Sequence, residues 1–129
     1  MNAPLLLAGT LAVAVAAVHS VQGERLLFAR LRWGSWIPTE GGALLREAHV
    51  RILWASWHVL SVFGLLAAAG LFWAALVPLP AGTRAVVAGG VAGAMGLGSL
   101  LVLVGTRGRH AGWVGMGVVA GLSGWGAGL

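Results

Sequence analysis

Long apolar stretches separated by short polar segments make up most of the chain. Four of them are long enough to cross the hydrocarbon core of a bilayer, which takes about 20 helical residues. They cover about residues 4–22, 52–77, 85–105 and 111–129. Lipid offers the backbone no hydrogen-bond partners, so a crossing segment must satisfy its peptide groups internally, as a helix does. The pattern predicts an all-α integral membrane protein, a four-transmembrane-helix bundle forming one domain over residues 1–129.

The composition agrees with this prediction. Of the 129 residues, 59% are hydrophobic and only 9% are charged, whereas a soluble domain carries about 25% charged residues. The chain has no cysteine, which excludes disulfides, thiolate metal sites and a cysteine nucleophile. No pair of a nucleophile and a base is evident, and no catalytic pair of carboxylates. We therefore do not expect an enzyme of the soluble type.

The positions of the basic residues predict how the chain is oriented. All eight are arginines, and only Arg84 lies in the second connection between spans. The other seven lie in the first and third connections: Arg25, Arg30, Arg32, Arg46, Arg51, Arg107 and Arg109. By the positive-inside rule these two connections are cytoplasmic and both termini lie outside, as in a multi-pass protein of a bacterial inner membrane. The net charge of +5 is then explained by contact with lipid headgroups, and no nucleic-acid partner is expected.

The third and fourth spans are rich in glycine and carry no charge. Gly89 and Gly93 form one pair of small residues four positions apart, and Gly117 and Gly121 form another. Such pairs let helix backbones approach closely in lipid. We expect these glycines to pack helices together, either in a homo-oligomer or against the partners of a larger membrane complex.

The first two spans carry the polar residues. His19 continues a helical stripe of small residues on the first span. One face of the second span carries five polar or aromatic side chains: Glu47, Arg51, Trp54, His58 and Ser61. If the two helices are adjacent and antiparallel, His19 and His58 face each other at a similar depth near the cytoplasmic side. Glu24 lies about 140° around an α-helix from His19 and joins the same site only if the helix breaks at Gly23.

Three classes of function fit these residues. The first is a bundle that binds haem b or a transition metal, with His19 and His58 as ligands and Glu24 as a further metal ligand, because neutral imidazole is a common ligand of both. The second is a non-catalytic accessory or assembly subunit of a larger membrane complex. The third is a small proton-coupled transporter or channel that uses Glu24 and His19.

A structural role is the alternative for the polar side chains. Each histidine would then hydrogen-bond a neighbouring helix, with Ser20, Ser61 or a tryptophan indole as its partner. The structural or gating polar cluster would consist of Ser20, Glu47, Arg51, Trp54 and Ser61. Glu47 and Arg51 would form an ion pair at a helix end, since they are four positions apart in the favourable order.

The stretches HSVQGERLL and RILWASWHVLS together resemble a pattern, HSxxGE followed by WHxxS, found in small four-span bacterial inner-membrane proteins. The matching positions are His19, Ser20, Gly23, Glu24, Trp57 and His58. The resemblance covers the first half of the chain. It implies the four-span fold and carries no activity over to this protein.

Overall fold

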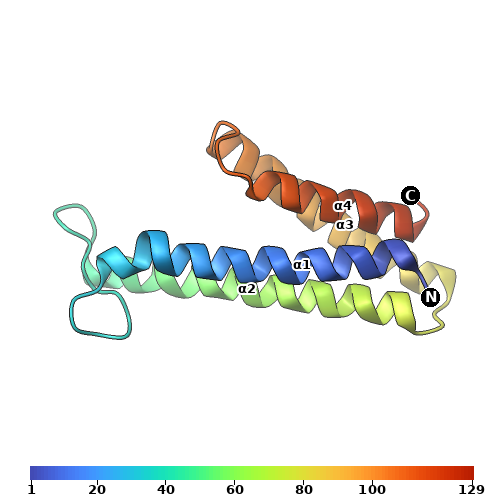
Figure 1. The fold of residues 1–129 in the computed structure, drawn as a ribbon, viewed down its shortest axis with the longest axis horizontal. Helices are drawn as coiled ribbons and strands as arrows, with labels where there is room; N and C mark the ends of the chain where they lie inside the picture. Colours follow the sequence, from blue (N-terminus) through green and yellow to red (C-terminus); the bar gives the residue numbers. More distant parts are fainter. The chain divides into compact units, whose positions relative to one another are not determined.

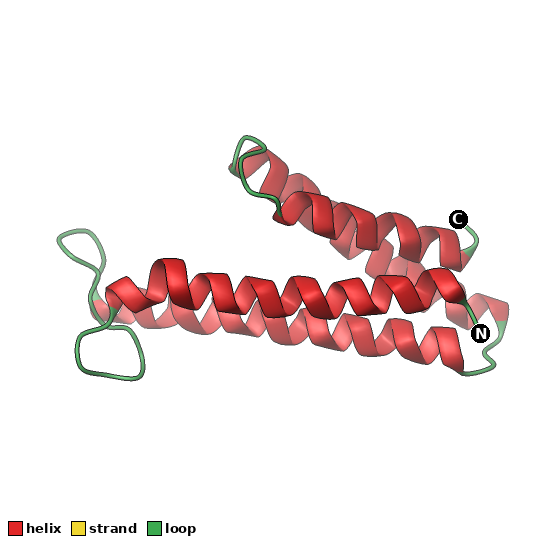
Figure 2. Cartoon of the chain, in the orientation of Figure 1, coloured by secondary structure: helices red, strands yellow, loops and turns green.

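The computed structural model describes residues 1–129, and the chain consists of helices joined by loops, without a strand (Figure 2). Its four α-helices are α1 (Ala3–Gln22), α2 (Glu47–Leu76), α3 (Ala81–Gly105) and α4 (Gly112–Ala127). Two short elements follow α1 directly: a π-helical turn, η1 (Gly23–Leu27), and a 3₁₀ turn, η2 (Phe28–Leu31). The prediction of an all-helical chain with four long helical segments is confirmed.

Three helical segments are long and apolar enough to cross a membrane: Ala3–Leu31, Glu47–Leu76 and Ala81–Gly105. Helix α4 has 16 residues and is therefore about 24 Å long, at 1.5 Å per residue. That is shorter than the roughly 30 Å of a typical hydrocarbon core. The crossing by α4, and with it the orientation of the two termini, stays a prediction.

The helices pack as two compact units. One unit comprises residues 1–15 and 64–129, and the other comprises residues 16–63. The core of the first unit consists mainly of alanines with a few larger side chains: Leu5, Ala8, Ala12, Ala68, Leu71, Ala74, Ala75, Ala88 and Val119. Small side chains at these positions allow segments of all four α-helices to approach closely, which is how helices associate in the absence of water.

Asn2 joins three helix ends within the first unit. Its side-chain oxygen accepts a hydrogen bond from the backbone N–H of Leu5 (3.2 Å) and so caps α1. Its side-chain nitrogen donates to the carbonyl of Gly126 (2.9 Å), near the end of α4. Its backbone N–H donates to the carbonyl of Ala75 (3.0 Å), near the end of α2. One polar residue therefore satisfies backbone groups that would otherwise lack partners at all three ends.

Helices α3 and α4 form a tightly packed hairpin in this unit (Figure 1). The hydroxyl of Ser99 on α3 donates to the carbonyl of Trp113 on α4 (2.6 Å). A Cβ atom added at Gly117 would lie 3.3 Å from that hydroxyl oxygen. The absence of a side chain at Gly117 therefore permits this approach.

The four glycines that we predicted to pack helices differ in their surroundings. Gly117 faces Ser99, and a Cβ atom added at Gly89 would lie 3.4 Å from the side chain of Leu129. A Cβ atom added at Gly93 or Gly121 would meet nothing within 4 Å. The packing role predicted for Gly93 and Gly121 therefore requires a second molecule and stays a prediction.

We expect Gly126→Ala to destabilise the first unit by about 1–3 kcal/mol, as overpacking does. The added Cβ would lie 2.6 Å from Cγ of Leu5, a fully buried side chain. Thermal unfolding in detergent, followed by circular dichroism, measures the effect. Gly121→Ala is the matched control because it adds the same methyl group to the same helix in open space. Equal melting temperatures for the two variants would contradict the packing described here.

Candidate functional site

The polar site lies within residues 16–63 and begins with a change in the helical backbone. The α-helical pattern of α1 ends at Gln22 and becomes π-helical at Gly23, as is frequent at functional sites. Gly23 is buried, and an added Cβ would collide with the indole of Trp57, 2.6 Å from its Cε2 atom. Only glycine permits Trp57 to lie this close to the backbone where the helix changes from α to π.

Trp57 is the centre of an aromatic cluster that braces this backbone. Its indole N–H donates to the carbonyl of His19 (2.9 Å). Its ring lies parallel to that of His19, with 4.3 Å between centroids. The fully buried ring of Phe28 meets it edge-on at 5.7 Å. His19 is therefore part of a stacked aromatic cluster, whereas His58 forms a polar network with Glu24 and Ser20.

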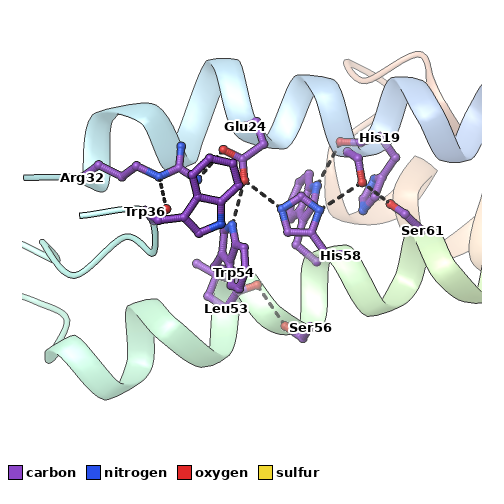
Figure 3. Close-up of polar contacts among 11 residues, drawn as sticks. His19, Glu24, Arg32, Trp36, Leu53, Trp54, Ser56, His58 and Ser61 are labelled. Atoms are coloured by element: carbon purple, nitrogen blue, oxygen red, sulfur yellow. Dashed lines mark hydrogen bonds and ion pairs between the residues drawn. The ribbon is translucent and has the colours of Figure 1, made fainter. Parts of the chain in front are cut away.

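Three side chains contact the carboxylate of Glu24 (Figure 3). The indole N–H of Trp54 donates to its Oε1 atom (2.7 Å). Nε2 of His58 lies 2.8 Å from the same oxygen. Nη2 of Arg32 lies 2.5 Å from the other oxygen, Oε2. Trp54 and His58 of α2, together with Arg32 from the loop after η2, thus hold this carboxylate in one position.

His58 connects Glu24 to two serines. Its second ring nitrogen, Nδ1, lies 3.1 Å from the hydroxyl of Ser20, which donates to the hydroxyl of Ser61 (2.8 Å). Glu24 and Ser20 thus contact the two nitrogens of one imidazole, and the tautomer of His58 decides which nitrogen donates.

The loop after η2 folds back and carries Arg32 to the site. Gly34 adopts a positive φ of 67°, which favours glycine, and the backbone N–H of Thr39 donates to the carbonyl of Leu31 (2.9 Å). Nε of Arg32 donates to the carbonyl of Trp36 (2.7 Å). The guanidinium group is therefore held between this loop and the carboxylate of Glu24.

An open cavity of about 480 Å³ lies between the loop and α2. This volume is within the usual range for small-molecule sites. Six residues line the cavity: Glu24, Arg32, Ser35, Trp36, Trp54 and His58. The polar network thus has one side open to a cavity of ligand size, and Ser61, at its other end, is only 7% exposed.

The structure brings together five of the residues singled out in the sequence. They are Ser20, Glu24, Trp54, His58 and Ser61. Glu47 and Arg51 stand apart: they form the expected ion pair with each other, 2.7 Å long, and both side chains are half exposed.

Arg32, Ser35 and Trp36 were not singled out from the sequence as site residues. Arg32 is one of five arginines in the first connection, and nothing in the local pattern distinguishes it from the others. The one available signal was Gly34, since a glycine between two tryptophans in a short polar segment indicates a turn. That turn allows Arg32 and the segment after it to line the same cavity as Glu24.

The contacts of the proposed ligand atoms affect whether these residues can bind haem or a metal ion. Both ring nitrogens of His58 are engaged, so coordination by His58 requires one of these hydrogen bonds to break. No group of three or more histidine, cysteine, aspartate or glutamate side chains is arranged to hold a metal ion. Ligation by His19, His58 and Glu24 therefore stays a prediction that would need a rearrangement of the site.

The fold and the site define a small helical membrane protein with a polar network among its helices. No protein-family model, no curated protein and no solved structure matches the chain.

Proposed function

We propose that this small membrane protein moves protons, as a transporter or channel in which Glu24 and His58 form the proton-accepting pair. The observation that carries the proposal is the position of His58, whose two ring nitrogens contact the carboxylate of Glu24 and the hydroxyl of Ser20. An imidazole with a partner on each nitrogen can receive a proton on one side and release it on the other. Histidine is suited to this task because its charge changes near neutral pH.

The surroundings of the pair support this role. Glu24 borders the open cavity, so protons can reach its carboxylate from water. The hydrogen bonds continue through Ser20 to the buried hydroxyl of Ser61. Ionisable residues within membrane segments commonly serve as proton relays. Among the three classes of function predicted from the sequence, proton transfer is the one that uses the network as it stands, with His58 in the place expected for His19.

Proton flux into vesicles tests the proposal. The purified protein is reconstituted into phospholipid vesicles that contain a pH-sensitive dye, and a potassium gradient with valinomycin supplies the driving potential. We expect wild-type vesicles to acidify faster than empty ones. Glu24→Gln and His58→Gln should each reduce the rate by about tenfold or more, because a positioned proton-transfer group contributes at least this much.

The matched controls are Glu47→Gln and His49→Gln. They make the same chemical changes at exposed positions near the start of α2 and should leave the rate unchanged. Circular dichroism of each variant shows whether it is folded. Wild-type flux equal to that of empty vesicles, or full flux in folded Glu24→Gln, would overturn the proposal.

A further inference from the structure

We infer that the cavity beside Glu24 binds small organic cations that carry an aromatic group, and that Arg32 occupies the cation position when no ligand is present. This inference deepens the proposed function and rests on it for the role of the site in transport. The Arg32 guanidinium is itself an organic cation bound to the carboxylate of Glu24.

Glu24 has two contacts besides the one with Arg32. Trp54 and His58 both contact its Oε1 atom from α2, which leaves Oε2 to Arg32 alone. If Arg32 leaves, two contacts to the carboxylate remain, and Oε2 of this cavity-lining residue becomes available. A negative charge fixed in this way is complementary to a cation.

Arg32 is the partner that can move. Its one other hydrogen bond goes to the carbonyl of Trp36 in the same loop. The side chains of the pair are 25% and 30% exposed, so water and solutes can reach both of them. A released guanidinium would be hydrated by the surrounding water, so displacement by another cation has a small cost.

The aromatic side chains of the cavity favour the same class of ligand. Trp36 and Trp54 both line the cavity, and indole faces attract organic cations through their quadrupole. The volume of about 480 Å³ exceeds what an inorganic ion needs. A carboxylate together with two indoles fits an ammonium or guanidinium group joined to an aromatic ring.

An anion fits this cavity less well. It would have to take Arg32 away from Glu24 and then lie beside a carboxylate that Trp54 and His58 keep in place. The anion and the carboxylate of Glu24 would then lie close together and repel each other. The effect of removing Arg32 therefore separates the two classes of ligand: cation binding should improve, whereas anion binding should be lost.

Isothermal titration calorimetry of the full-length protein in detergent tests the inference with benzyltrimethylammonium as the probe. We expect wild type to bind it, and Arg32→Gln and Arg32→Ala to bind it at least about tenfold more tightly because the competing guanidinium is gone. Glu24→Gln should lose binding. Arg30→Ala removes an exposed arginine two positions away and should leave the affinity unchanged. Benzylsulfonate, which has the same aromatic group with the opposite charge, should not bind.

Loss of benzyltrimethylammonium binding in folded Arg32→Gln, or binding of benzylsulfonate that depends on Arg32, would overturn the inference. So would the absence of binding to both wild type and Arg32→Gln. No proton gradient is present in this experiment, so its result is independent of the vesicle assay. Proton flux without cation binding would refute the inference alone, and cation binding without proton flux would refute the proposed function alone.

Discussion

Trp57→Ala is expected to destabilise the unit formed by residues 16–63 by about 3 kcal/mol, the lower end of the cost of truncating a packed tryptophan. The substitution removes the stack on His19, the edge contact with Phe28 and the hydrogen bond to the His19 carbonyl. It also leaves a void against Gly23, where the backbone changes from α to π. Thermal unfolding in detergent, followed by near-ultraviolet circular dichroism, measures the loss.

Trp33→Ala is the matched control for Trp57→Ala. It removes the same side chain from the first connection, where Trp33 is 83% exposed. We expect no change in its melting temperature beyond experimental error. If both variants melt at the wild-type temperature, the aromatic cluster does not brace the site.

Glu24→Ala is expected to release the loop after η2 and to cost about 2 kcal/mol, the typical contribution of hydrogen bonds to a charged group. Without the carboxylate, Trp54, His58 and Arg32 each lose a partner. Arg32 is then held only by the loop to which it belongs. Amide hydrogen exchange should therefore become faster across residues 28–46, while exchange in α3 stays unchanged.

Glu47→Ala provides the comparison for this effect. Glu47 also pairs with an arginine, but both side chains are half exposed, and such a pair contributes about 0–1 kcal/mol. Its removal should leave amide exchange in residues 28–46 as in wild type. Slow exchange of that segment in Glu24→Ala would show that the loop is ordered independently of the carboxylate.

The two proposals assign different tasks to one carboxylate. Proton transfer uses Oε1 of Glu24, which faces His58, whereas cation binding uses Oε2, which faces Arg32. A protonated Glu24 would hold a cation less strongly, because the charge that attracts it would be gone. Proton and organic cation would therefore compete for this residue.

Much of the helical structure could be predicted from the apolar pattern, because helix formation in lipid depends on local length and composition. The segment predicted over residues 4–22 agrees closely with α1, and α2 and α3 each begin a few residues earlier than predicted. Helical periodicity also placed Trp54, His58 and Ser61 on one face, and all three do contact the network.

The partner of His58 could not be predicted in this way. Facing helices can rotate about their axes, and periodicity does not specify which residue of α1 meets His58. The sequence suggested His19 as the facing residue, with Ser20 among the alternative hydrogen-bond partners. The ring of His19 stacks on Trp57, and Ser20 makes the contact with His58. Ser20 and Glu24 lie four positions apart, so both can approach the same side of α2.

By itself, the sequence determined the class of protein: a helical membrane protein whose polar chemistry lies in its first half. This information is local, since it depends on the apolar length of each segment and on the spacing of residues along one helix. Only the tertiary structure decided that Glu24, His58 and Arg32 meet at one cavity. That meeting depends on a π turn at Gly23, on an indole of α2 packed against it and on a loop that folds back. The contacts of Glu24 with Trp54 and His58 join residues far apart in the chain, which local patterns do not specify.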